Sequence, residues 1–144
     1  MRQVLILALA AAILSGCVAD RNVQKPYVIA DAISAPEYQS KLQGIGLYFG
    51  NQPHPSVART FGIRTTSTRS NAVGKENDFA CARAFVSGLS RLQRAARRMG
   101  GDAVINIKSN FKHREVSSET HFQCATGALM SGVALKGTVV KLEK

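Results

Sequence analysis

The sequence contains no tryptophan, and aromatic residues supply only 6% of its 144 residues. Acidic residues are also scarce, since nine Asp and Glu stand against nineteen Lys and Arg and leave a formal net charge of +10. With 19% charged and 45% hydrophobic residues, the composition excludes a disordered polyelectrolyte and allows an apolar core. The length suggests one domain, and the basic charge favours anionic partners.

Motifs of the common enzyme classes are missing. A P-loop needs G-x-x-x-x-G-K-[ST], but Gly74-Lys75 is followed by Glu76 and has Arg69 at the first glycine position. No G-x-S-x-G motif occurs, and the serines and histidines form no known nucleophile arrangement. We therefore predict a protein that is not an enzyme and needs no cofactor, with an uncharacterised hydrolase as the enzyme alternative.

The apolar run near the N-terminus is too short to cross a membrane. Residues 4–14 contain only Val, Leu, Ile and Ala, whereas a membrane-spanning helix needs about 20 apolar residues. Arg2 precedes this run, and Leu14-Ser15-Gly16-Cys17 ends it. The order is typical of a secretory signal peptide, and its last four residues resemble the bacterial lipobox. We predict a signal peptide over residues 1–16 and lipidation of the Cys17 thiol.

The alternative to lipidation is an ordinary secretory signal followed by an incidental cysteine. The lipoprotein resemblance implies more than one acyl chain on Cys17, palmitate included, and stable anchoring generally takes more than one chain. It also implies sorting to the outer membrane, because Val18 rather than Asp follows the cysteine. The expected location is therefore the bacterial cell envelope, with the lipid in the outer membrane and the protein facing the periplasm.

The remaining chain predicts an α+β fold. Residues 17–30 are expected to be the lipidated N-terminus and a tether, and residues 31–144 to form a single domain. The expected elements are a short helix starting at residues 34–37, strands over 44–49 and 59–66, a polar loop over 65–75, a helix over 77–99, and strands near 103–111, 122–124 and 133–142. Two strands, one long helix and three strands predict an antiparallel sheet of about five strands with the helix packed on one face.

The long helix has the clearest pattern. Its apolar positions recur at helical spacing, Asn77-Asp78 offers a cap, and Gly100-Gly101 ends it. The apolar set is Phe79, Ala82, Val86, Leu89, Leu92, Ala96 and Met99.

Arg91, Arg94 and Arg98 form one stripe on this helix, at three- and four-residue spacing. They are either solvated side chains or a surface that contacts anionic phospholipid, lipopolysaccharide or an acidic envelope polymer. Nucleic acid is not an expected partner, because no aromatic stacking platform accompanies these arginines and the periplasm holds little nucleic acid.

Two cysteines remain once Cys17 is lipidated. Cys81 falls in the first turn of the predicted helix, and Cys124 lies on the core-facing side of a strand. Because disulfides persist in the periplasm, we predict a Cys81–Cys124 disulfide. Two unpaired buried thiols are the alternative.

A metal site is the rival functional prediction. His113 and His121 flank the turn expected at residues 115–119 and are able to meet across a hairpin, with Cys124 as a third ligand. The spacing H-x7-H-x2-C is not a standard zinc pattern, and a disulfide would remove the thiolate. Exposed turn histidines are the simpler interpretation, so no metal is predicted.

From Cys81 onward the chain resembles a known family. The features are the helix end Ala95-Ala96-Arg97-Arg98-Met99-Gly100-Gly101, the strand starting Asp102-Ala103-Val104, and the closing Gly137-Thr138-Val139-Val140-Lys141-Leu142. They resemble the YbjQ-type domains, which carry a heavy-metal-binding label, and the similar domain of the outer-membrane lipoprotein that senses envelope stress for the Rcs phosphorelay.

Small periplasmic lipoproteins, some labelled "excinuclease ATPase subunit", share further segments with this chain. These are Cys-Ala-Arg-Ala-Phe, Glu-Val-Ser-Ser-Glu-Thr and Gly-Val-Ala-Leu-Lys-Gly. The resemblance covers about half of the chain and implies a fold and a compartment but no activity. The stress sensor has four structural cysteines and a proline-rich tether that this chain lacks, so its partner contacts are not carried over.

We therefore predict a non-catalytic, membrane-anchored periplasmic lipoprotein that binds or monitors envelope components. Its expected partners are the membrane, through the N-terminal lipid, and anionic phospholipid, lipopolysaccharide or another envelope protein. A metal-binding periplasmic domain is the alternative.

Overall fold

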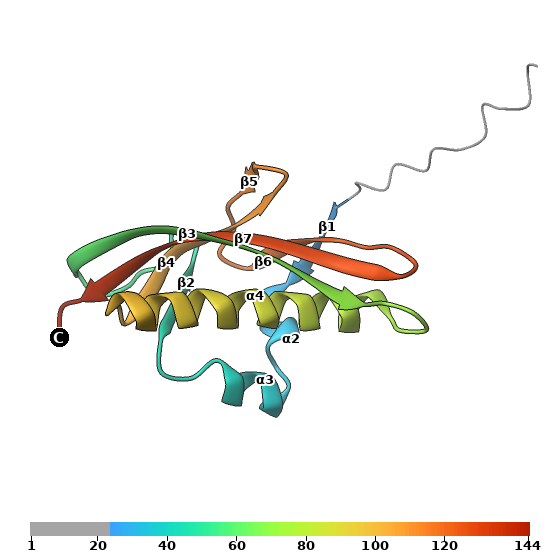
Figure 1. Ribbon diagram of the computed structural model, residues 1–144, viewed down its shortest axis with the longest axis horizontal. Helices are drawn as coiled ribbons and strands as arrows, with labels where there is room; N and C mark the ends of the chain where they lie inside the picture. Colours follow the sequence, from blue (N-terminus) through green and yellow to red (C-terminus); the bar gives the residue numbers. More distant parts are fainter. Residues whose placement is uncertain (1–23) are drawn as a thin grey trace, which may run out of the picture.

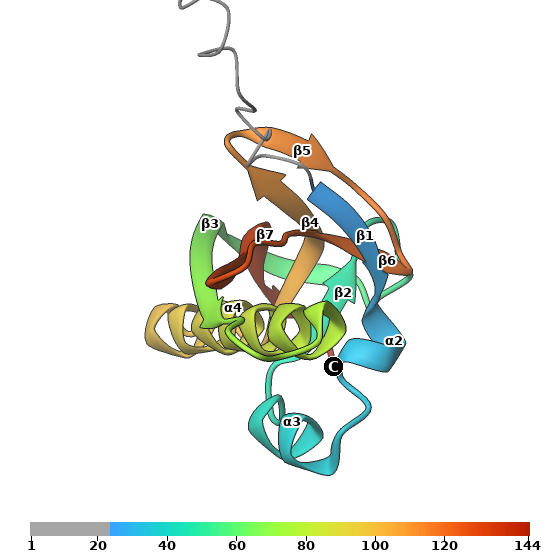
Figure 2. The ribbon, with the colours of Figure 1, turned by 90° about the vertical axis from the view of Figure 1, so that its right-hand side faces the viewer.

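A long helix lies along one face of a twisted sheet in the computed structural model, which describes residues 24–144 (Figures 1 and 2). The elements are β1 (Gln24–Val28), α2 (Ile29–Ala32), α3 (Pro36–Lys41), β2 (Gly46–Phe49), β3 (Val57–Asn71), α4 (Asn77–Met99), β4 (Ala103–Phe111), β5 (Arg114–Val116), β6 (His121–Ala125) and β7 (Met130–Leu142). The α+β prediction with one long helix packed on the sheet is confirmed.

β7 is the centre of the sheet. It pairs antiparallel with β3 along almost its whole length and with β4 and β6 on its other side. β1 pairs antiparallel with β6, β5 pairs with β4, and β2 pairs with β4 in parallel. The predicted five-stranded antiparallel sheet is therefore corrected to seven strands with one parallel pair.

Three segments were assigned wrongly from the sequence. Residues 24–30, predicted as tether, form β1 and the start of α2. The polar segment 65–71, predicted as a loop, continues β3 because it pairs with β7 and places Thr68 and Ser70 in the buried layer under α4. The turn expected at residues 115–119 begins later, because residues 114–116 form β5.

α4 begins and ends close to the predicted positions. Glu76, rather than Asn77, is the N-cap residue, and Gly100 adopts the left-handed conformation (φ 83°) that ends the helix. Of the predicted apolar face, Val86, Leu89, Leu92 and Ala96 are buried, whereas Phe79 is 48% exposed. The buried face is completed by residues outside that pattern, namely Ala80, Cys81, Ala84, Phe85, Gly88 and Gln93.

A disulfide joins Cys81 of α4 to Cys124 of β6, with the sulfurs 2.04 Å apart and the Cα atoms 6.0 Å apart. Both cysteines are fully buried, and next to them Phe85 stacks on Phe122 with ring centroids 3.9 Å apart. The disulfide predicted from the sequence is present, and it fixes the first turn of α4 to the sheet.

Side chains of the neighbouring strand explain a glycine in β7. A Cβ atom added to Gly137 would lie 2.6 Å from Cγ1 of Val104 on the neighbouring strand β4, far inside van der Waals contact. The absence of a side chain at this position therefore lets β4 and β7 pack under α4.

The segment before β2 is held against α4 by a buried side chain. The Gln93 amide donates hydrogen bonds to the backbone carbonyls of Leu42 (3.0 Å) and Ile45 (2.8 Å). α3, expected to start at residues 34–37, starts at Pro36 with Ala35 as N-cap residue. The Ser34 hydroxyl donates to the Asp31 carbonyl at 2.8 Å.

Candidate functional site

Four arginines line a groove between α4 and β3, which we name the arginine groove. It has a volume of about 450 Å³, and its charged lining residues are Arg64, Arg91, Arg94 and Arg98. A second hollow of about 500 Å³ shares Arg91 and Arg94 and adds Lys41 and Arg83. No acidic residue lines either hollow, so the surface is uniformly positive.

Local geometry explains why these side chains gather. Arg91, Arg94 and Arg98 follow one another at three- and four-residue intervals on α4, which places them on one face of the helix. The Arg91 guanidinium donates to the Ser67 carbonyl of β3 at 3.1 Å, which ties this face to the strand. Arg97, on another face, donates to the Gln43 carbonyl at 2.8 Å and holds the segment before β2.

The structure brings the three arginines of the predicted stripe together and adds Arg64, which the sequence analysis missed. Arg64 lies in β3, and only the packing of β3 on α4 shows that it belongs to the same surface. None of the four forms an ion pair with another residue of the described part of the chain. Within residues 24–144, therefore, no carboxylate pairs with these charges.

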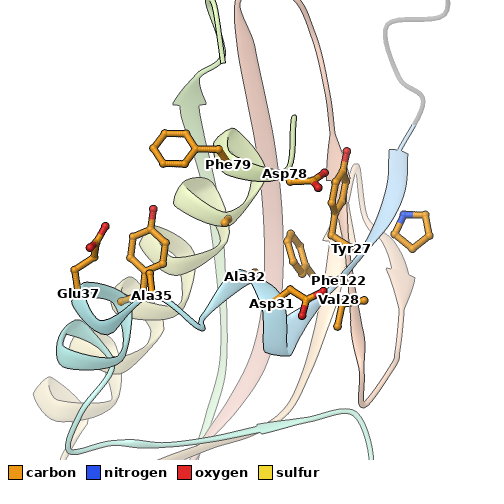
Figure 3. A pocket seen from close by; sticks show the side chains of 12 residues that line it. Tyr27, Val28, Asp31, Ala32, Ala35, Glu37, Asp78, Phe79 and Phe122 are labelled. Atoms are coloured by element: carbon orange, nitrogen blue, oxygen red, sulfur yellow. The ribbon is translucent and has the colours of Figure 1, made fainter. Parts of the chain in front are cut away.

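A third hollow, of about 540 Å³, lies among β1, α2, the start of α3 and the first turn of α4 (Figure 3). Its walls are mostly apolar, and its charged lining residues are Asp31, Glu37 and Asp78. Each of these carboxylates occupies the first turn of a different helix, where a negative charge interacts favourably with the unpaired backbone N–H groups. Helix geometry alone therefore accounts for the acidic rim.

Tyr27 and Tyr38 also line this hollow, and both hydroxyls resist ionisation. Burial raises the pKa of Tyr27, and the Asp78 carboxylate adds to the effect; Figure 3 shows the two side chains facing each other. Burial likewise raises the pKa of Tyr38, which the Glu37 carboxylate raises further and Arg83 opposes. The neutral phenols are thus favoured at neutral pH.

His113 and His121, the candidate metal ligands, do not belong to a cluster of three ligands among the described residues. His113 is exposed in the turn between β4 and β5, and the ring of His121 lies 2.8 Å from the Thr120 hydroxyl. Cys124 is committed to the disulfide. Among residues 24–144, no three His, Cys, Asp or Glu side chains lie close enough together to hold a metal ion.

An ion-paired cluster lies on the other face of the sheet. The Glu115 carboxylate of β5 bridges Lys108 of β4 and Lys136 of β7. Hydrogen bonds from Lys136 and then Lys108 lower the pKa of Glu115. This cluster fastens the short β5 hairpin to the sheet.

Within the described residues, no serine hydroxyl is hydrogen-bonded to a histidine ring. No helix between residues 24 and 144 is long and apolar enough to cross a membrane. The predicted signal peptide and Cys17 lie outside the described residues. Comparisons with protein-family models, curated proteins and solved structures give no significant match.

Proposed function

We propose that this chain is a non-catalytic lipoprotein of the bacterial envelope, lipidated at Cys17, anchored in the outer membrane and facing the periplasm. In this proposal the arginine groove binds an anionic envelope component, such as a phospholipid or lipopolysaccharide headgroup. The observation that carries the binding role is the set of four unneutralised arginines around one groove without an acidic residue.

Arginine suits this role because its planar guanidinium pairs with two oxygens of a phosphate or carboxylate at once. Arg64 and Arg98 come from different elements, so a phosphate between them is contacted from two sides. Arg91 is already oriented by its bond to the Ser67 carbonyl, which reduces the side-chain entropy lost on binding.

A charge-matched pair of variants tests the groove. Arg91→Gln/Arg94→Gln/Arg98→Gln removes three groove charges, and Arg59→Gln/Arg114→Gln/Lys144→Gln removes three charges elsewhere. Basic residues at an acidic lipid surface contribute about 1 kcal/mol each, so the groove variant should bind vesicles containing phosphatidylglycerol, or lipopolysaccharide, on the order of 100-fold more weakly. Equal losses for the two variants would show that net charge alone, and not the groove, attracts the ligand.

The anchor is tested separately. Mass spectrometry of protein from the native membrane should find a lipid-modified N-terminal cysteine at position 17 and no residue of the predicted signal peptide. An unmodified Cys17 would refute the anchor and, with it, the envelope location.

A further inference from the structure

We propose that the end of the molecule opposite the arginine groove inserts into an anionic phospholipid bilayer through an apolar tip formed by Val73, Leu129 and Met130. This inference rests on the proposed function, because the lipid anchor at Cys17 would bring this end of the molecule to the bilayer.

The tip combines exposed apolar side chains from the loop after β3, the loop before β7 and the first residue of β7. Met130 pairs with Asn71 at the end of the β3–β7 ladder, and the Ala72 amide donates to the Leu129 carbonyl at 2.9 Å, so Val73 follows directly beside them. Val73 is 57% exposed, Leu129 69% and Met130 46%. Exposed large apolar side chains that gather in one place, rather than singly, mark an interaction surface.

Positive charge lies immediately behind the tip. Arg69 and Lys112 are the charged residues that line a hollow of about 310 Å³, and Met130 forms part of its wall. Lys75 follows Val73 in the loop before α4. Apolar side chains beside cations match an interface in which acyl chains lie next to anionic headgroups.

The chain that leads to Cys17 leaves the fold at the same end. Gln24, the first residue of β1, pairs with Ala125, only four positions before Leu129. Six residues lie between Cys17 and Gln24, and the seven Cα–Cα steps of an extended chain between them span at most about 25 Å. A lipid on Cys17 would therefore hold the tip near the bilayer surface.

The arginine groove lies too far along the molecule to share this contact. The tip adjoins the loop before α4, whereas Arg94 and Arg98 lie in the C-terminal half of this 23-residue helix (Figure 1). At 1.5 Å per residue the helix is about 35 Å long. The groove therefore lies roughly 20–30 Å from the tip along the helix and takes no part in this contact.

Because the chain has no tryptophan, a single introduced tryptophan reports on its own position without background. Full-length lipidated Leu129→Trp protein is reconstituted into vesicles of phosphatidylethanolamine and phosphatidylglycerol with brominated acyl chains. The matched control is Ile63→Trp, which replaces another exposed apolar residue (54% exposed) on β3 away from the tip. Quenching should be at least twofold stronger for Leu129→Trp than for Ile63→Trp.

A second variant tests the headgroup contact. In the Leu129→Trp background, Arg69→Gln/Lys112→Gln should reduce quenching in vesicles containing phosphatidylglycerol, whereas Arg59→Gln/Lys144→Gln should leave it unchanged. Equal quenching of Leu129→Trp and Ile63→Trp would overturn the proposal. A blue-shifted, concentration-dependent emission without vesicles would also overturn it, because it would place a second copy of the chain on the tip.

The outcomes separate this inference from the proposed function. Protein that fails to float with the vesicles lacks the anchor, which counts against the proposed function. Protein that floats but leaves Leu129→Trp unquenched keeps its anchor and counts against the tip alone. Loss of headgroup binding in the groove variants leaves the tip measurement unaffected, because Arg91, Arg94 and Arg98 lie outside the tip.

Discussion

Reduction of the Cys81–Cys124 disulfide should cost a large part of the stability of the fold. The bond closes a loop with a sequence separation of 43 residues, and the chain-entropy model assigns about 4 kcal/mol to a loop of that size. The conformational stability of a typical domain is only about 5–15 kcal/mol. Both cysteines are fully buried, so the reduced thiols remain in the core as small apolar groups.

The assay is urea unfolding of the chain from residue 18 onward, which includes every described residue and leaves Cys81 and Cys124 as the only thiols. The oxidised and reduced forms contain the same side chains, so their difference isolates the crosslink. With a urea dependence of about 2 kcal/mol per molar, the midpoint should fall by about 2 M on reduction.

A fall in the midpoint of less than about 0.5 M would refute this reasoning, because the crosslink would then be worth no more than about 1 kcal/mol. The variant Cys81→Ala/Cys124→Ala provides a second comparison, since it removes the bond irreversibly. Its midpoint should be no higher than that of the reduced protein, because the two missing sulfurs also leave unfilled space in the core.

Two further predictions concern β7 and the hollow beside β1. Gly137→Ala should destabilise the protein by about 1–3 kcal/mol in the same unfolding assay, because the added methyl group overlaps the neighbouring strand; an unchanged midpoint would contradict the close approach. Tyr27 should ionise above the usual tyrosine pKa, so its contribution to stability is present below about pH 10 and is lost as pH rises through the folded-state pKa. Phenolate absorbance, compared with Tyr27→Phe, measures that pKa, and Asp78→Asn should lower it only partly because burial remains the main cause.

The sequence predicted α4 well because its signals are local. A helical period of apolar residues, acidic residues at its start and Gly100-Gly101 at its end all lie within the helix or next to it. β1 and β5 were missed because their stability comes from pairing with strands elsewhere in the chain: Gln24, for example, pairs with Ala125. No periodicity within so short a segment reports such a partner.

In β4, the alternation of apolar and polar residues predicts the wrong buried side chain. Strict alternation from Ala103 along β4 would bury Ile105, but Ile105 is only partly buried, whereas Val104 is fully buried. The cause is an irregularity in the pairing with β7 between Ile105 and Lys108, where Asn106 adopts a positive φ of 51°. One extra residue in a strand reverses which side chains face the core beyond it.

Part of the candidate site was also predictable from local sequence signals, and part was not. The stripe of Arg91, Arg94 and Arg98 follows from helical spacing and was predictable, whereas Arg64 joins it only through the packing of β3 on α4. The disulfide was predictable from the parity of the cysteines and the expected oxidising compartment. The apolar tip was not, because the segments that carry Val73 and Leu129 come together only when β3 and β7 pair to their ends.

The disulfide also provides a route for mechanical force. Tension on the chain entering at Gln24 reaches β6 through the β1–β6 ladder, and Lys25 of β1 pairs directly with Cys124. From there a covalent bond passes the load to the first turn of α4, so the pull bypasses the intervening loop of the chain. If the chain before Gln24 is stretched while the arginine groove holds its ligand, α4 lies between the two points of attachment and bears the tension. The residues between Cys81 and Cys124 cannot be extended by this force, because the disulfide closes them into a covalent loop.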